Sequence, residues 1–558
     1  MTLKKLTLPE LLKNSCSKFS KNLSLNFVAS GKRTYQDLYN EVVSIANHLL
    51  HLGVKKGDKV AILSANMPNW GITQFAIANI GAVAVPILPG FCSTELQNIL
   101  EHAEVKVIFV SRLLAKCLEG VETPFLEHKI LINNFATIPE GCYAPEDLDK
   151  LVPDIDLNNT TPLPEIPVEE EDIASIIYTS GTTGFSKGVI LTHKNLVWDA
   201  RQCRTIQHVD ESDRFLSILP MAHTYENTLG LLLPLMFGSQ VYYLDRVPTP
   251  KLLVPAMQKI HPTVILSVPL IIEKIYKSQV LPKFNGSKLM STLYRFSPTR
   301  KLFNRLAGKK LMETFGGELK FFGVGGSKLD GTVEQFLREA KFPYAIGYGL
   351  TETAPMAAGS NPSQTFLQGV GPIMEGVQIK INEPDKKGEG EIWIKGPNVM
   401  QGYYKRPELN AEVFTEDGWF KTGDLGTFDK KNRLAIRGRI KTMILGASGE
   451  NIYPEEIESI INNFRFVNES LVVENSGKLV AMVHFNMEEL EKQYQKLKDQ
   501  AGNYKEKIND YIEEQKQELR DYVNARVNNF SKLQLVLVQH EPFEKTPTHK
   551  IKRFLYCK

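Results

Sequence analysis

The hydrophobic positions in the first 110 residues alternate between two periods, one typical of helices and one typical of buried strands. Apolar residues three or four positions apart, such as Leu38, Val42 and Leu49, predict helices, whereas short β-branched runs predict strands inside a sheet. Strand, helix and strand in this order predict βαβ units and a largely parallel sheet. We expect helices over residues 34–50, 70–82 and 95–103, a turn followed by a strand over residues 57–63, and strands over residues 83–87 and 105–110.

The pattern changes in the last third of the chain. Short strands at residues 377–381 and 390–395 predict a small β-rich part. Within residues 488–528, apolar residues recur at helical spacing among many charged ones, which predicts a solvated helix pair. A chain of 558 residues is too long for one hydrophobic core. The sequence therefore predicts an α/β protein of two or more domains.

The composition of the chain argues against several classes of protein. Lys and Arg (66) nearly balance Asp and Glu (63), which argues against a dedicated nucleic-acid binder. No apolar run reaches bilayer-spanning length, and the first residues lack the apolar core of a secretion signal, so we expect a cytoplasmic protein. The six cysteines include no Cys-x-x-Cys pair, which predicts reduced thiols without a disulfide framework or a zinc site.

The most informative stretch is the loop at residues 178–188, which lies between predicted strands at 173–177 and 189–191. It holds glycines, hydroxyl residues and Lys187. Glycines let backbone N–H groups converge on one point, hydroxyls add donors, and the lysine adds a positive charge for phosphate oxygens. A common P-loop continues from Gly-Lys-Ser/Thr into a helix, whereas Lys187 precedes Gly188 and a strand. The alternative to a phosphate-binding loop at these residues is an ordinary surface hairpin.

Two further strands run into glycine-rich ends, where parallel α/β sheets bind ligands. Residues 319–324 lead into Gly325-Gly326-Ser327, and residues 344–346 lead into residues 347–353. A third predicted strand, residues 215–219, ends just before His223. These ends and the loop at 178–188 therefore predict one ligand site.

The order Thr-Ser-Gly-Thr-Thr-Gly-x-x-Lys-Gly at residues 179–188 resembles the phosphate loop of the AMP-forming, adenylate-forming (ANL) enzymes. That superfamily includes acyl-CoA synthetases, luciferases and the adenylation domains of peptide synthetases. Residues 347–353, 398–404, 418–424, 438–454 and 544–553 resemble further motifs of the superfamily, in its order. Residues 268–276 resemble a segment of long-chain fatty acyl-CoA synthetases, so the chain looks closest to bacterial long-chain fatty acid–CoA ligases.

The resemblance implies a nucleotide site. It places Lys187, Glu352, Thr351 and Lys550 in catalysis, and it makes Glu352, with Thr179, the ligands of Mg²⁺. It implies that ATP is bound by Thr179, Ser180, Gly181, Thr182, Thr183, Gly184 and Lys187 of the phosphate loop, by Gly325, Gly326 and Ser327 along the adenosine, by Tyr348 stacked on the adenine, by Gly349, by Thr351 at the α-phosphate, by Asp424 and Arg439 at the ribose, and by Lys441.

For the other substrates, the resemblance implies that His223, Thr224, Gly325 and Gly349 border the carboxylate and acyl chain. Gly449, Glu450 and Asn451 belong to a loop that serves the coenzyme A step. Three residues depart from the usual motifs: Ser186 for proline, Leu445 for a lysine found in some members, and His549 for glycine. Each assignment has a simpler alternative: a structural histidine at 223, a helix cap at Glu352, a turn at residues 422–424 and a solvated Lys550.

Residues 274–312 contain ten basic residues and no acidic one, with large apolar residues interleaved. Such a stretch can lie on an anionic membrane surface. The alternative is a solvated helical insertion.

The resemblance implies a large N-terminal domain of parallel α/β sheets over residues 1–438, with a β-rich subdomain at about 368–438. A small mobile C-terminal α/β lid follows over residues 439–558, with its hinge near Lys441.

The implied activity is that of an acid–thiol ligase, which converts a long- or medium-chain fatty acid, ATP and coenzyme A into acyl-CoA, AMP and pyrophosphate. Three alternatives stay open: a ligase for aryl or short acids, an enzyme that loads a separate carrier protein (no carrier domain follows Lys558), and a non-catalytic scaffold. Peripheral contact with the inner face of the membrane and a homodimer also stay open.

Overall fold

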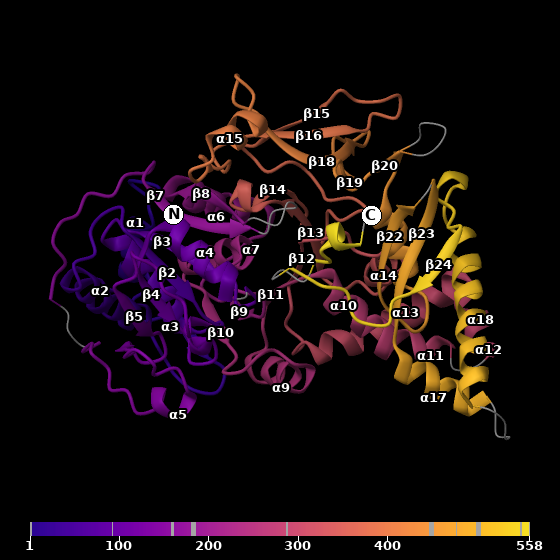
Figure 1. Ribbon diagram of the computed structural model, residues 1–558, viewed down its shortest axis with the longest axis horizontal. Helices are drawn as coiled ribbons and strands as arrows, with labels where there is room; N and C mark the ends of the chain where they lie inside the picture. The colour runs from indigo at the N-terminus through magenta and orange to yellow at the C-terminus, as the bar shows by residue number, and fades with distance from the viewer. Residues whose placement is uncertain are drawn as a thin grey trace.

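Two large, mainly parallel sheets form the body of the molecule, and three smaller sheets of four, three and two strands complete the described structure (Figure 1). A computed structural model describes residues 3–91, 93–157, 161–179, 186–285, 288–445, 451–475, 477–497, 504–546 and 550–556. The N-terminal part, in indigo and violet, lies at one end of the molecule, and the C-terminal part, in yellow, lies at the other. The predicted α/β architecture is therefore confirmed.

The first large sheet has eight strands and contains the predicted βαβ units. Its order is β17 (Gly402–Tyr403), β8 (Lys187–Thr192), β7 (Ile173–Thr179), β3 (Val83–Ile87), β2 (Lys59–Leu63), β4 (Val105–Val110), β5 (His128–Leu131) and β6 (Ala136–Thr137). Strands β2, β3 and β4 are parallel, as their apolar runs and intervening helices predict. Strands β7 and β8 form an antiparallel hairpin with Thr179 opposite Lys187, so the second strand begins two residues earlier than expected.

Local sequence signals start the helices near this sheet. Thr34 and Asp37 form a capping box at the beginning of α2, and Thr192 and Asn195 form another at α6. The predicted helices at 34–50, 70–82 and 95–103 are confirmed in type, with ends shifted by a few residues, as α2 (Tyr35–His51), α3 (Pro68–Asn79) and α4 (Ser93–Ala103). The other helices in this part are α1 (Leu8–Lys18), α5 (Pro145–Leu148) and α6 (His193–Ile206).

The second large sheet has seven strands, all parallel except the last pair. Its order is β1 (Leu25–Phe27), β10 (Gln240–Tyr243), β9 (Arg214–Ser217), β11 (Val264–Ser267), β12 (Phe321–Val324), β13 (Tyr344–Gly349) and β14 (Met356–Gly359). The accompanying helices are α7 (Thr224–Glu226), the π-helix η2 (Asn227–Leu232), α8 (Leu233–Met236), α9 (Pro250–Ile260), α10 (Pro269–Ile275), the π-helix η3 (Tyr276–Val280), α11 (Leu281–Asn285), α12 (Lys288–Arg295), α13 (Ser297–Thr314) and α14 (Gly331–Glu339).

The β-rich part is an antiparallel sheet of β15 (Gln378–Asn382), β16 (Gly390–Lys395), β18 (Phe420–Phe428) and β19 (Leu434–Arg439), accompanied by α15 (Pro407–Val413). The predicted start of the lid, residue 439, is the last residue of β19. The smaller C-terminal domain follows with β20 (Ile444–Leu445), β21 (Asn451–Ile452), α16 (Pro454–Ile461), β22 (Val467–Asn475), β23 (Lys478–Phe485), α17 (Met487–Leu497), α18 (Tyr504–Asn524) and β24 (Leu535–Val538).

The C-terminal domain has a core of its own. Leu490 of α17 and Leu519 and Val523 of α18 are fully buried in it. The predicted helix pair is thus confirmed, but it is more than a solvated one, because its apolar face covers the sheet of β22, β23 and β24.

The sequence analysis expects neither a disulfide framework nor a membrane-spanning segment. Cys16, Cys117, Cys142 and Cys203 are free thiols, while Cys92 and Cys557 lie outside the described residues. Within the ranges given above, no helix combines the length and the hydropathy needed to cross a bilayer.

Candidate functional site

The predicted site residues lie at the ends of strands that belong to three different sheets. Thr179 ends β7, Lys187 begins β8, and both belong to the eight-stranded sheet. Tyr348 and Gly349 end β13 of the seven-stranded sheet, and Asp424 lies in β18 of the small sheet. The loop residues Ser180, Gly181, Thr182, Thr183 and Gly184 lie outside the described residues.

Lys187 and Glu352 share one aromatic neighbour, Tyr403. The Tyr403 hydroxyl donates a hydrogen bond to Oε1 of Glu352 at 2.8 Å, and Nζ of Lys187 lies 4.9 Å from the centroid of the Tyr403 ring. Burial lowers the pKa of Lys187, the charge of Lys441 lowers it further, and Glu352 opposes both. The structure therefore brings the predicted lysines and the predicted metal-ligating carboxylate into one electrostatic environment.

Tyr403 was missed as a site residue by the sequence analysis. The sequence indicated Tyr403 only through the motif at residues 398–404, because a tyrosine in a sequence does not show which residues its hydroxyl and ring will contact. The alternative in which Glu352 caps a helix is wrong, because Glu352 lies inside the 3₁₀ turn η4 (Thr351–Thr353) and its side chain accepts from Tyr403.

Asp424 is a buried carboxylate held by two partners. Its Oδ1 lies 3.0 Å from Nε of Arg439, and its Oδ2 accepts a hydrogen bond from the Tyr348 hydroxyl at 2.8 Å. Arg439 is the residue opposite Asp424 in the pairing of β18 with β19. Burial raises the pKa of Asp424, and Arg439 counteracts this shift. The turn alternative for residues 422–424 is wrong, because these residues lie within β18.

Lys550 lies far along the chain from these groups, yet its pKa responds to their charges. Protein atoms around it disfavour its charge and lower its pKa, although part of its side chain remains exposed to solvent. Arg439 lowers this pKa further, whereas Asp424 and Glu352 raise it. The catalytic role of Lys550 stays a prediction.

His223 belongs to the same region and begins α7. Its Nδ1 accepts a hydrogen bond from the backbone N–H of Tyr225 at 3.2 Å, so this nitrogen carries no proton. Burial lowers the pKa of His223 to about 4, and the charge of Lys550 acts in the same direction. The next residue, Thr224, is buried, and its hydroxyl has no hydrogen-bond partner in the described structure.

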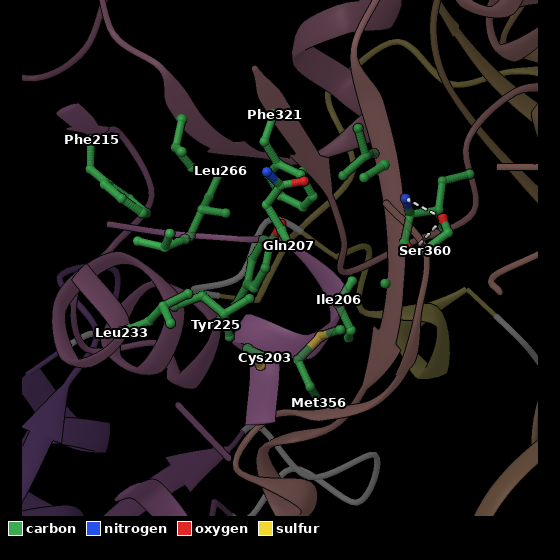
Figure 2. Close-up of a pocket in the computed structure, with 18 residues that line it drawn as sticks. Cys203, Ile206, Gln207, Phe215, Tyr225, Leu233, Leu266, Phe321, Met356 and Ser360 are labelled. Atoms are coloured by element: carbon green, nitrogen blue, oxygen red, sulfur yellow. Dashed lines mark hydrogen bonds between the residues drawn. The ribbon is translucent and has the colours of Figure 1, made fainter. Parts of the chain in front are cut away.

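Tyr225 separates this polar region from an apolar cavity. An added Cβ on Gly325 would lie 3.3 Å from the Tyr225 ring, so the ring packs directly on the predicted adenosine loop. Tyr225 also lines a narrow, partly open cavity of about 40 Å³, bordered by Leu266, Phe321 and Met356 (Figure 2). Apolar side chains dominate this lining, and Gln207 and Ser360 are its polar exceptions.

The remaining predicted residues surround these groups or fall outside them. Gly326 and Ser327 are exposed in the loop after β12, and Gly326 has φ +89°, which favours glycine. Asn451 is exposed in β21 and pairs with the exposed Leu445. Gly449, Glu450 and His549 lie outside the described residues.

The donor set fits a magnesium ion only together with a ligand's own oxygens. Glu352 offers a hard carboxylate, and Thr179 offers a hydroxyl at the end of β7. Across the described ranges, no group of three or more acidic, histidine or cysteine residues could hold a metal ion. Magnesium is usually bound by one or two carboxylates plus substrate phosphates, which is the arrangement that these residues would allow.

Comparison with known proteins gives a consistent result. The family model described as AMP-binding enzyme matches residues 12–404. Fatty acyl-CoA synthetase A of Dictyostelium discoideum is 26% identical over 94% of this chain and 85% of its own length. Long-chain-fatty-acid–CoA ligase FadD15 of Mycobacterium bovis is 29% identical over 84% of this chain and 80% of its own. Among solved structures, an ATP-bound RpMatB-BxBclM chimera matches with TM-score 0.77 and 22% identity, covering 99% of this chain and 98% of its own, which supports the fold.

The backbone at Gly349 leaves no room for a side chain. A Cβ there would lie 1.6 Å from the carbonyl oxygen of Pro355. We expect Gly349→Ala to lower the free energy of unfolding by about 3 kcal/mol, because the chain must shift to relieve the overlap. The control is Gly331→Ala at the start of α14, where a Cβ would meet only the flexible Gln368 side chain at 3.4 Å. Thermal melts of both variants check this, and equal melting temperatures would contradict it.

Proposed function

The chain belongs to the AMP-binding enzyme family, and from this premise we propose that it is a fatty acid–coenzyme A ligase. It activates a long- or medium-chain fatty acid with ATP and transfers the acyl group to the thiol of coenzyme A. The observation that carries the proposal is geometric: Tyr403 contacts both Lys187 and Glu352, and Asp424 contacts both Tyr348 and Arg439. The names of the two relatives support the same substrate class.

In the first half-reaction a carboxylate oxygen of the fatty acid attacks the α-phosphorus of ATP. A new oxygen–phosphorus bond forms, the bond to the β-phosphate breaks, and pyrophosphate leaves. The acid is already ionised, so the step needs charge neutralisation and positioning rather than a general base. Lys187 and Lys550 supply positive charge, Thr351 contacts the α-phosphate, and a magnesium ion on Glu352 would neutralise phosphate oxygens.

The nucleotide is oriented by its ribose. The Asp424 carboxylate accepts hydrogen bonds from both ribose hydroxyls, with Arg439 beside it. Tyr348 stacks on the adenine, and its hydroxyl holds Asp424 in place. His223 stays neutral near pH 7 because its pKa is about 4, so it borders the substrate carboxylate without adding charge.

In the second half-reaction the thiol sulfur of coenzyme A attacks the acyl carbonyl carbon, and AMP leaves. We propose that the C-terminal domain rotates near Lys441, which withdraws Lys550 and brings the loop of residues 449–451 towards the site. One site is thus assembled twice, once for each step.

A ligase for aryl or short acids and an enzyme that loads a separate carrier protein remain alternatives. Pyrophosphate release across acids from acetate to oleate identifies the acid. Thioester formation with and without coenzyme A identifies the acceptor. If none of the fatty acids in the panel causes pyrophosphate release, the proposal is refuted.

The role of Lys550 separates the two half-reactions. We expect Lys550→Ala to slow adenylate formation by about 10²- to 10³-fold, because a positive charge at the reacting phosphate is lost. Thioester formation from synthetic acyl-AMP should change little, since Lys550 has left the site by then. Pyrophosphate release and acyl-CoA formation measure the two steps. Lys552→Ala, which removes a nearby positive charge, is the control, and equal loss of both steps would refute the assignment.

The apolar cavity is the proposed acyl site, and its width depends on a glycine. A Cβ on Gly347 would lie 3.0 Å from the terminal methyl of Met356, whose flexible side chain could yield. We expect Gly347→Val to occupy cavity space and to lower pyrophosphate release with oleate by about 10-fold or more. Release with the shortest active acid should be preserved and serves as the internal control. An unchanged ratio between the two acids would place the acyl chain elsewhere.

We also propose that the basic helix α13 rests on an anionic membrane surface. Its outward positions carry Lys301, Arg305 and Lys309 beside exposed Leu302 and Leu306. Leu289 and Phe296, at and after α12, are likewise exposed. Basic groups attract anionic headgroups, and the leucines can enter the interfacial layer.

This surface can be tested with vesicles. We expect the triple variant Lys301→Gln/Arg305→Gln/Lys309→Gln to lose most co-sedimentation with vesicles of phosphatidylglycerol and phosphatidylcholine at low salt, because three favourable charges are removed. The exposed residues Lys386, Lys387 and Lys430, changed to Gln together, form a control of equal charge. Equal binding by the two triple variants, or no binding by the unchanged protein, would refute the membrane contact.

A further inference from the structure

The C-terminal domain meets the large domain at several points, and one of them is a buried carboxylate, Asp330. This residue is 6% exposed and precedes α14, three residues after the predicted adenosine loop ends. Its Oδ1 accepts from the backbone N–H groups of Thr332 and Val333 at 2.8 and 2.9 Å, which caps α14. One oxygen of Asp330 therefore serves the large domain alone.

The other oxygen faces the C-terminal domain. Oδ2 of Asp330 accepts a hydrogen bond from the side-chain amide of Asn463, and the Ser459 hydroxyl lies 3.3 Å away. The Asn463 amide also donates to the backbone carbonyl of Ser459 at 2.9 Å, which fixes the direction in which the amide points. Asp330 thus holds the end of α16 against the start of α14.

Two further contacts surround this one. Nζ of Lys328 lies 2.8 Å from Oε1 of Glu456 in α16, with both side chains partly exposed. On the large-domain side, Oε1 of Glu273 accepts from the backbone N–H of Asp330 at 3.0 Å. Partly exposed ion pairs contribute little by themselves, whereas the carboxylate of Asp330 is buried where it meets the half-buried Asn463.

We propose that Asp330 and Asn463 are positioning residues for adenylate formation, which hold the C-terminal domain where Lys550 reaches the reacting phosphate. The inference rests on the proposed function. In this orientation the charges of Asp424 and Glu352 raise the pKa of Lys550. In the same orientation Asp330 accepts a hydrogen bond from Asn463 of the C-terminal domain. Rotation for the second half-reaction would part Asn463 from Asp330, so this contact favours the first step only.

The test exchanges the two groups. Asn463→Asp sets two carboxylates against each other, and we expect it to slow pyrophosphate release with a fatty acid and ATP by about 10-fold or more. Thioester formation from synthetic acyl-AMP should stay within about 2-fold, because this step does not need the contact. Adding Asp330→Asn restores one amide and one carboxylate, and asparagine still caps α14. The double variant should recover pyrophosphate release to within about 3-fold of the unchanged protein.

The matched control is Asn486→Asp, the same chemical change in the same domain. Asn486 bonds only to Glu489 and to the backbone of its own domain in the described structure, so both steps should be unchanged. Melting curves establish that all variants fold. Equal slowing of both steps by Asn463→Asp, no slowing at all, or no recovery in the double variant would overturn the positioning role. Absence of pyrophosphate release in the unchanged protein would instead refute the proposed function.

Discussion

Opposite charges held together in partial burial are the interaction on which this site depends. Asp424 has a raised pKa because burial disfavours its charge, and Arg439 keeps the carboxylate compensated. The protein surroundings lower the pKa of Lys550, whereas the charges of Asp424 and Glu352 raise it. Asp424 and Arg439 therefore compensate each other, and a movement of the C-terminal domain that displaces Lys550 would change the electrostatics of the site.

Tyr225 contacts the predicted adenosine loop and also lines the apolar cavity. A fatty acid has an apolar chain and one charged end, so a mainly apolar lining suits its chain. Glycines allow this packing of Tyr225, because a side chain at Gly323 would lie 2.8 Å from the Tyr225 hydroxyl and one at Gly325 would press on its ring.

Several features became visible only in three dimensions. Tyr403 joins Lys187 to Glu352, although it lies more than 200 residues from Lys187 and about 50 from Glu352 in the sequence. Asp330 resembles any helix cap in the sequence, and its second oxygen gains a partner only because α16 docks beside α14. The helix pair of α17 and α18 looked solvated because charged residues dominate it, yet its few apolar positions complete a core. Local patterns cannot report such contacts, because the partner comes from another part of the chain.

The sequence by itself determined the kind of protein. Its periodicities predicted the alternating α/β sheets, its glycine-rich strand ends predicted the ligand site, and its ordered motifs predicted the family that the comparisons bear out. The predicted fold and family are confirmed because strand and helix periods, turn chemistry and sequence motifs are local properties of consecutive residues, whereas the ligand site stays a prediction. Only the tertiary structure decided which charges face one another, where the cavity lies, and which surface of the C-terminal domain contacts the large one. Those outcomes depend on the packing of elements hundreds of residues apart, which no local pattern specifies.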